Sequence, residues 1–268
     1  MPLRIAFDLD GVLADMESEL VRQAEAIFGE AMTQKLQERA ETRQPQTETD
    51  TKQTPSPNDT ADTTDPGEPG EFRQTPPASL DDSTPPVVKL NMTSRQERRL
   101  WRHVGAIEDF WESLNEIEPG VISRLAGIAV KRRWEIIFLT KRPQTAGATP
   151  QVQSQRWLES KGFTLPSVFV VQGSRGRIAE ALGLDIVIDD RPENCLDVVV
   201  DSKARAILVW REDEKALPVA ARRLGIGIVK TVNECLDILT AVDSQTPQEP
   251  GMLDRVRRML GLKDAEQV

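Results

Sequence analysis

Short apolar runs alternate with amphipathic segments along most of the chain. Six runs of four or five residues have the composition of buried strands: residues 3–7, 135–139, 167–171, 185–188, 206–210 and 226–229. Helical spacing of apolar residues marks the segments between them: residues 12–37, 94–114, 121–132, 151–161, 178–182, 193–201 and 232–242. Because strands that alternate with helices pair in parallel, the pattern predicts an α/β fold with one parallel sheet between two helical layers.

The alternation stops between residues 41 and 89. Thr, Pro, Asp, Glu, Gln and Ser fill this stretch, and Phe72 and Leu80 are almost its only large apolar residues. Such a segment buries too little surface to offset the entropy of ordering, so we expect a disordered, acidic insertion. It would be a tolerated surface insertion, or else a tether, a partner-binding tail or a platform for modification.

Charge follows the same division. Residues 41–88 contain ten acidic and three basic side chains, so they hold most of the net charge of −9. The remainder is nearly neutral and gives no support for a nucleic-acid-binding surface. Cys195 and Cys235 have no spacing typical of a disulfide or a metal site. The start of the chain lacks a signal-peptide layout, and no apolar run is long enough to span a bilayer. We therefore expect a cytoplasmic protein.

Two further segments have patterns of their own. Apolar and aromatic residues recur through 94–114, which predicts the core of a small helical subdomain; Phe110 or Trp111 would alternatively form a hydrophobic lid over a substrate. Residues 244–251 have the composition of a linker, and residues 252–263 form an amphipathic pattern with three arginines on one side. This C-terminal helix would dock on the domain, on a partner or on a membrane surface.

Carboxylates and a threonine follow three of the predicted strands. Asp8 and Asp10 come after the first strand, Thr140 after the second, and Asp189 and Asp190 after the fourth. The carboxyl ends of parallel strands share one edge of a sheet, which is where ligands bind. Four carboxylates there would repel one another without a cation, and hard oxygen ligands favour Mg²⁺. A zinc site built on histidine is excluded, because the only histidine, His103, lies in the helical segment.

These motifs resemble those of the haloacid dehalogenase superfamily. Residues 8–13, Asp-Leu-Asp-Gly-Val-Leu, are similar to its motif I, Leu139-Thr140 to motif II, and Ile188-Asp189-Asp190 to motif IV. The motifs Thr140-x-Arg142-Pro143 and Asp189-Asp190-Arg191-Pro192 further resemble the 5′(3′)-deoxyribonucleotidase group. The resemblance implies a Rossmann-like core formed by residues 1–15 and 118–243. It also implies a helical cap, formed by residues 16–40 and 90–117 and interrupted by the insertion.

The resemblance implies a role for each motif residue. Asp8 would be the nucleophile and form an aspartyl-phosphate. Asp10 would protonate the leaving group and later deprotonate the attacking water. Thr140 would hold a phosphoryl oxygen, with Lys141 as a further phosphate ligand. Mg²⁺ would be bound by Asp8, the carbonyl of Asp10, Asp189 and Asp190, and would reduce the repulsion between two anions.

The chain departs from the family pattern at motif III, which is usually a lysine about a dozen residues before the acidic pair. The sequence in this region is Gly-Ser-Arg-Gly-Arg, residues 173–177, with no lysine. Arg177 lies at the matching distance, and Arg175 is a near alternative. Lys141 or Arg142 could also supply the charge. Arginine binds with a planar fork, so the replacement is not neutral.

The reaction expected from these residues is hydrolysis of a small phosphate monoester, with a nucleoside or deoxynucleoside 5′-monophosphate as the favoured substrate. The alternative is a catalytically weak protein of the same fold with a binding or regulatory role. A polynucleotide 3′-phosphatase is disfavoured, because the near-neutral folded part predicts no basic groove. The sequence does not indicate an oligomeric state.

Overall fold

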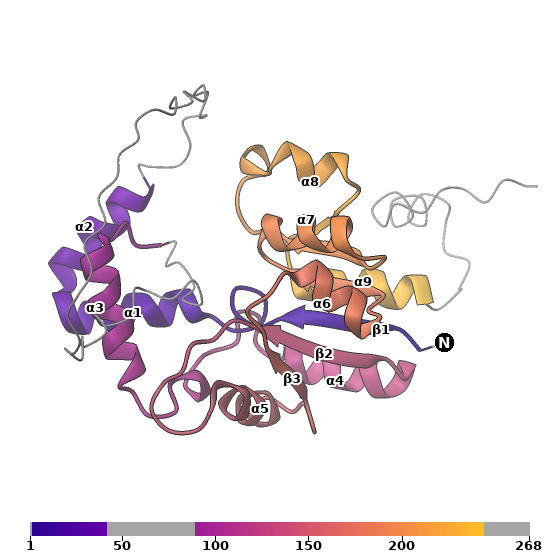
Figure 1. Ribbon diagram of the computed structural model, residues 1–268, viewed down its shortest axis with the longest axis horizontal. Helices are drawn as coiled ribbons and strands as arrows, with labels where there is room; N and C mark the ends of the chain where they lie inside the picture. Colours follow the sequence, from indigo (N-terminus) through magenta and orange to yellow (C-terminus); the bar gives the residue numbers. More distant parts are fainter. Residues whose placement is uncertain (1, 42–88, 244–268) are drawn as a thin grey trace, which may run out of the picture.

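The computed structural model describes residues 2–41 and 89–243, and its centre is one six-stranded parallel sheet with the order β3-β2-β1-β4-β5-β6 (Figure 1). The strands are β1 (Arg4–Asp8), β2 (Glu135–Thr140), β3 (Ser167–Val170), β4 (Ile186–Asp189), β5 (Arg205–Val209) and β6 (Gly227–Val229). Each lies within a residue or two of a predicted apolar run. The predicted α/β class and parallel sheet are confirmed.

Helices cover both faces of the sheet. They are α4 (Val121–Arg132), α5 (Pro150–Ser160), α6 (Arg175–Leu182), α7 (Pro192–Asp201), α8 (Val219–Arg223) and α9 (Val232–Asp243), with 3₁₀ turns η1 (Phe110–Glu112) and η2 (Glu214–Ala216). Alternate residues of β1 face opposite cores. Ile5 and Phe7 pack with α4, α5 and α9, whereas Ala6 packs with α6 and α7. The result is three layers.

Three further helices lie to one side of the sheet (Figure 1). They are α1 (Met16–Phe28), α2 (Glu30–Glu41) and α3 (Ser94–Gly105). The prediction of one helix over residues 12–37 is wrong. The chain first makes a tight turn, and helix α1 ends at Gly29, whose φ of +83° interrupts the helix. Thr93 caps the start of helix α3 and forms a capping box with Gln96.

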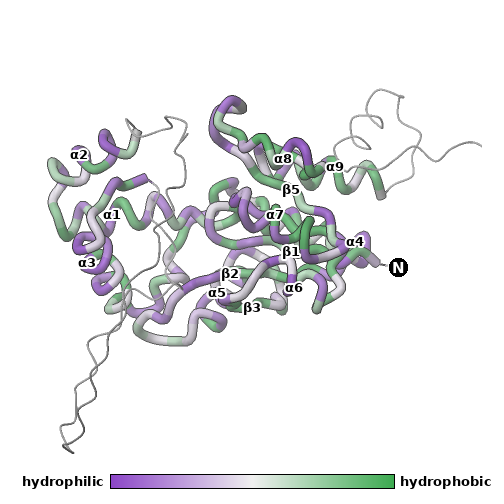
Figure 2. The backbone as a smooth tube through the Cα atoms, turned by 45° about the horizontal axis from the view of Figure 1, so that its top comes forward, coloured by the Kyte–Doolittle hydropathy of each residue, from purple (hydrophilic) through white to green (hydrophobic). Residues whose placement is uncertain are grey.

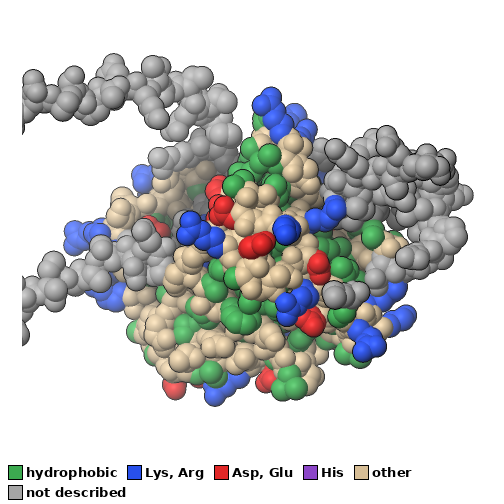
Figure 3. All heavy atoms as spheres, turned by 45° about the vertical axis from the view of Figure 1, so that its right-hand side comes forward, with side chains coloured by type: hydrophobic (Ala, Val, Ile, Leu, Met, Phe, Trp, Pro, Cys, Tyr) green, Lys and Arg blue, Asp and Glu red, His purple; other side chains and the backbone are tan. Residues whose placement is uncertain are grey.

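Hydropathy differs between the strands of the sheet and the helices beside it. Strands β1 and β5 are largely hydrophobic, whereas long parts of α2 and α3 are hydrophilic (Figure 2). On the face in Figure 3, acidic and basic side chains are interspersed rather than gathered by sign. Among the helices in the described ranges, none has the length and hydropathy that crossing a bilayer requires. The expected linker 244–251, the C-terminal helix 252–263 and nearly all of the expected insertion lie outside the described residues.

Candidate active site

The predicted site residues of three strands meet at the carboxyl edge of the sheet. Strand β1 lies between β2 and β4, so the ends of these strands at Asp8, Thr140 and Asp189 are neighbours. All three side chains are buried; Asp8 is 7% exposed, and the other two are 0% exposed. Their convergence follows from parallel pairing, because adjacent strands end at the same edge.

Gly11 turns the chain sharply after β1. Its φ is +87°, and the nitrogen of Gly11 donates to the carbonyl of Ala14 at 3.0 Å. A Cβ atom at Gly11 would lie 2.1 Å from Oδ2 of Asp190, so only glycine allows the two loops to approach. Arg211 supports the same turn by donating to the carbonyls of Gly11 and Val12. The turn thus places Asp190 beside the first motif.

Arg175 provides the positive charge of the site. It is the first residue of α6 and is 2% exposed; its Nη2 donates to Oδ1 of Asp8. Its Nε lies 3.6 Å from Oδ2 of Asp189, so one guanidinium joins the first and fourth strands. Nη1 is buried without a hydrogen-bond partner among the described residues. A buried donor without a partner is costly, so an acceptor placed there would satisfy it.

The structure corrects the placement of Arg177. This residue is exposed on α6, two positions beyond Arg175, and its backbone nitrogen donates to Oγ of Ser174. Residues two apart in a helix do not share a face, so only one of the two arginines can point to Asp8. Lys141 is half-buried and lines the cavity beside Asp8.

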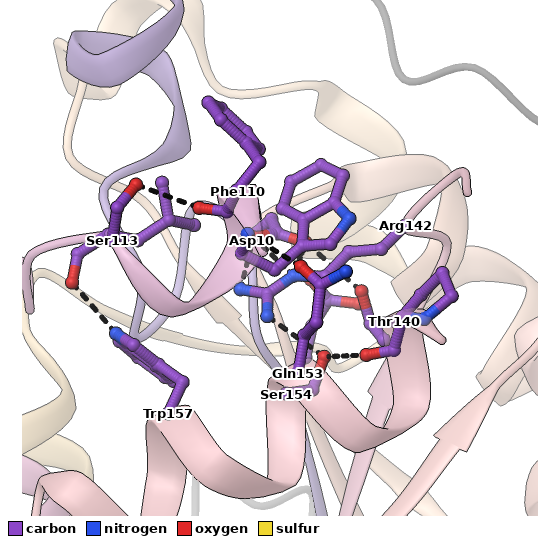
Figure 4. Close-up of polar contacts among 12 residues, drawn as sticks. Asp10, Phe110, Ser113, Thr140, Arg142, Gln153, Ser154 and Trp157 are labelled. Carbon is purple, nitrogen blue, oxygen red and sulfur yellow. Dashed lines mark hydrogen bonds and ion pairs between the residues drawn. The ribbon is translucent and has the colours of Figure 1, made fainter. Parts of the chain in front are cut away.

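Asp10 is held by a different set of donors. Thr140 Oγ1 donates to Asp10 Oδ2 at 3.0 Å. Arg142 donates from Nε and Nη2 to Oδ1, at 3.1 and 2.8 Å (Figure 4). The hydroxyl of Thr140, which was expected on a phosphoryl oxygen, therefore contacts the Asp10 carboxylate in this structure.

Burial raises the pKa of the carboxylates at the ends of β1 and β4. Burial raises the pKa of Asp8 well above its usual range, and the charge of Asp189 raises it further, while Arg175 opposes both. Burial also raises the pKa of Asp189, against Arg175 and hydrogen bonds from Arg191 and Asn194. Burial and then the charge of Asp189 raise the pKa of Asp190 to about 7. Among the described residues, Arg175 alone pairs with both buried aspartates, Asp8 and Asp189, so one guanidinium faces two carboxylates.

The donor set suits a hard divalent cation. Oδ1 of Asp190 is buried without a hydrogen-bond partner among the described residues, and Asp8 and Asp189 lie beside it with excess negative charge. No three Asp, Glu, His or Cys side chains of residues 2–41 and 89–243 are grouped in a way that could hold a metal ion. The carboxylates at the strand ends are therefore not preassembled around a metal in this structure. A bound Mg²⁺ would need Asp8, Asp189 and Asp190 to come together around it, and Asp10 would offer its carbonyl, because its carboxylate pairs with Arg142.

Two adjoining cavities open onto these groups. The smaller has a volume of about 80 Å³ and is lined by both motif I aspartates, Lys141, Arg175 and Asn194. The other, about 350 Å³, shares Gly11 and Asp190 with it and is also lined by Trp210. The first cavity fits only a small group, and the second falls within the range of small-molecule sites. A third cavity, about 1000 Å³, lies at the opposite edge, near the strand starts at Arg4 and Ser167, and is lined by none of the predicted site residues.

Sequence analysis missed Asn194 and gave Arg142 a different contact. Asn194 donates from Nδ2 to both oxygens of Asp189 at 3.0 Å. Its position in the first turn after a strand-end aspartate was an available signal. Arg142 was considered as a source of charge for phosphate, but it pairs with Asp10 instead. Nothing in the sequence pattern specified the direction of that long side chain.

Comparison of the sequence with protein-family models and with curated proteins finds no match. Solved structures with a related arrangement include a hydrolase from Pseudomonas syringae, at 16% identity and a TM-score of 0.46, over 91% of this chain and 100% of that chain. Another is a HAD family hydrolase from Deinococcus radiodurans R1 with bound phosphate and sodium, at 15% identity and a TM-score of 0.45, over 91% and 97%. Similarity at this level carries no conclusion about activity, so the functional argument rests on the site itself.

Proposed function

We propose that this protein is a Mg²⁺-dependent phosphatase of small phosphate monoesters that forms an aspartyl-phosphate on Asp8. One observation carries the proposal: two buried groups of opposite charge lack partners beside the same aspartate. These are Nη1 of Arg175 and Oδ1 of Asp190. An anion and a cation bound together would satisfy both groups, and a phosphoryl group with its metal is such a pair.

The chemistry assigns distinct tasks to the residues of the site. A carboxylate oxygen of Asp8 attacks phosphorus, and the bond from phosphorus to the leaving oxygen breaks. Asp10 donates a proton to that oxygen and then takes one from the water that cleaves the aspartyl-phosphate. Arg175 and Lys141 bind the phosphoryl oxygens. Bound Mg²⁺ lowers the repulsion between the anionic nucleophile and the anionic phosphate.

The adjoining cavities support a small organic leaving group. The 80 Å³ cavity beside Asp8 holds the phosphoryl group, and the 350 Å³ cavity holds the remainder of the substrate. Trp210 provides an aromatic side chain there, on which a nucleobase could stack. Among phosphate monoesters we favour a nucleoside or deoxynucleoside 5′-monophosphate.

Helices α1 to α3 form the cap of this proposed enzyme. Met16 and Glu17, at the start of α1, line both cavities, and Lys89, which precedes α3, lines the larger. The chain enters these helices after Asp15 and returns toward the sheet at Asn115. A hydrogen bond from the nitrogen of Asp15 to the carbonyl of Asn115, 2.9 Å long, holds these two connections side by side. Substrate selection would be made where this helical unit faces the strand ends.

The test is hydrolysis of p-nitrophenyl phosphate with and without Mg²⁺. We expect turnover that EDTA removes and that Asp8→Asn abolishes, with a loss of at least ~10³-fold. Asp237→Asn is the control, because Asp237 forms an exposed ion pair with Arg124 far along α9. A panel of nucleotides and sugar phosphates then ranks substrates.

Turnover that survives Asp8→Asn would contradict the nucleophile assignment. The second candidate is a binding or regulatory protein that uses the same site, and the arginine at motif III supports it. This candidate predicts no turnover by the unmodified protein, together with a rise in melting temperature when phosphate and Mg²⁺ are added.

A further inference from the structure

Arg142 has the environment of an interior residue although it belongs to a loop. It follows β2 by two positions, yet it is 1% exposed. Its guanidinium carbon lies 4.9 Å from the ring centre of Trp111 and 5.6 Å from that of Trp157. Its Nη1 donates to Oγ of Ser154 at 2.9 Å. The guanidinium therefore has two aromatic neighbours and a hydrogen bond to Ser154.

The two tryptophans are themselves fixed. Trp111 Nε1 donates to the carbonyl of Pro143 at 3.1 Å, and its backbone nitrogen donates to Oε1 of Gln153 at 3.0 Å. Trp157 Nε1 donates to the carbonyl of Leu114 at 2.8 Å. Figure 4 shows Gln153 and Ser154 beside Arg142, with the guanidinium directed at Asp10. An arginine held in this way has one orientation, so its donors define where Asp10 lies.

We infer that Arg142 is a positioning residue for Asp10 and thereby controls the acid–base steps of the reaction. The inference rests on the proposed function. Arg142 binds Oδ1 of Asp10 through Nε and Nη2, and Nε also lies 3.0 Å from Oδ2. Together with Thr140, it fixes the carboxylate on both oxygens. The role of Arg142 is separate from that of Arg175, which contacts Asp8 and Asp189.

Stability alone does not account for such a pair. Burying a guanidinium and a carboxylate removes both from water, and a well-packed apolar pair is often at least as stable. A planar, bidentate pair does give precise orientation. Orientation is the quantity on which proton transfer depends, since a displacement of about 1 Å can cost on the order of 10²-fold in rate.

Both half-reactions need Asp10. In the first, the bond from phosphorus to the leaving oxygen breaks as Asp8 attacks, and the proton of Asp10 passes to that oxygen. In the second, Asp10 takes a proton from water, whose oxygen attacks phosphorus, and the bond to Asp8 breaks. A p-nitrophenolate leaves without a proton, so p-nitrophenyl phosphate needs Asp10 only in the second half-reaction. An alkyl phosphate needs it in both.

This difference provides the test. In Arg142→Lys, we expect rapid release of about one equivalent of p-nitrophenolate, followed by turnover slowed roughly 10- to 100-fold. Acid quenching should trap phosphorylated protein during the slow phase. With glycerol phosphate the same variant should show slow formation of the phosphorylated protein as well. For p-nitrophenyl phosphate, kcat and KM should fall together and kcat/KM should change little, because kcat/KM reports only the first half-reaction and Arg142 does not line the cavity beside Asp8. Asp10→Asn should reproduce the pattern.

Arg124→Lys is the control, since Arg124 pairs with Asp237 between α4 and α9 and should leave both phases unchanged. Ser154→Ala is a milder second variant that removes only one contact of Arg142, and a smaller effect in the same direction is expected. Equal slowing of both phases, or normal kinetics in both Arg142→Lys and Ser154→Ala, would overturn the inference. An unmodified protein without any Mg²⁺-dependent turnover would instead remove the proposed function on which it rests.

Discussion

Gly11 has a backbone conformation that only glycine adopts easily, and it lies against Asp190 of the site. Its φ of +87° is disfavoured for other residues, and an added Cβ would meet the Asp190 carboxylate at 2.1 Å. We expect Gly11→Ala to destabilise the protein by roughly 1–3 kcal/mol and to remove most activity, because the turn must move away from Asp190. Urea unfolding and phosphatase assays measure the two effects.

Gly127→Ala is the matched control for that substitution. Gly127 lies inside α4 at an ordinary φ, and an added Cβ there would have no atom within 4 Å. Alanine at a helix interior should leave stability unchanged or raise it by about 0.5–1 kcal/mol. Equal stability of Gly11→Ala and the unmodified protein would contradict the tight approach of the two loops.

Asp190 makes stability depend on pH. Burial raises its pKa in the folded protein from 3.8 to about 7, so folding favours the protonated form. The corresponding stability is fully present below pH 3.8 and is lost as the pH rises to 7. In metal-free protein, Asp190→Asn should therefore raise the melting temperature at pH 8 and change it little at pH 4. A scanning calorimeter measures both, and a larger gain at pH 4 than at pH 8 would contradict the assignment.

The sequence predicts backbone positions at the site better than it predicts the arginines. Asp8, Thr140 and Asp189 end adjacent strands, and the apolar runs before them locate those ends to within a residue or two. Arg175 and Arg142 begin in loops or first helical turns, and their side chains are long. Their targets depend on packing that no local pattern encodes. For this reason the spacing along the sequence favours Arg177, whereas the structure puts Arg175 beside Asp8.

Among the elements, α6 controls the site most directly because Arg175 is its first residue. The helix packs closely on α7 at Gly176, where an added Cβ would lie 2.0 Å from the carbonyl oxygen of Asp197. Gly176→Ala must push the two helices apart and carry Arg175 away from Asp8. We expect a loss of about 1–3 kcal/mol in stability and weaker phosphate binding.

Gly173→Ala is the control for Gly176→Ala. Gly173 lies in the loop before α6, and a Cβ there would have no atom within 4 Å. Denaturant titrations and phosphate binding followed by calorimetry should show a large effect for Gly176→Ala and little for Gly173→Ala. If both variants bind phosphate like the unmodified protein, the position of Arg175 does not depend on the contact between α6 and α7.

The helices were predictable to differing degrees for physical reasons. Helix α4 has the predicted bounds, because Gly120 precedes it in the left-handed region and Arg133 ends it in the same conformation. The helical spacing of apolar residues across 12–37 continues through the turn before α1 and through the break at Gly29. Spacing alone therefore predicts one helix where the structure has a turn followed by α1 and α2. A single Gly29 outweighs periodicity when its φ is positive.

On the scale of the whole molecule, the described chain before residues 42–88 contacts the described chain after them. The nitrogen of Asn91 donates to the carbonyl of Leu36 at 3.1 Å, and Leu36 and Leu90 are both buried in the core shared with α3. The helices α1 to α3 thus contact one another through described residues on both sides of 42–88. We expect these contacts to be sufficient for the packing of the three helices.

Replacing residues 42–88 by a short Gly/Ser linker should therefore leave the fold intact. Shortening a closed loop changes its closure entropy only by a term logarithmic in length, so we expect a change in stability of about 1 kcal/mol or less, with a small gain favoured. Differential scanning calorimetry of the full chain and the shortened chain tests this. Asn91→Ala, which removes a side-chain contact with Arg39, is a control that perturbs the same junction. A large fall in melting temperature on shortening alone would show that the acidic segment stabilises the helices beside the strand ends, and substrate ranking would then have to be measured with it present.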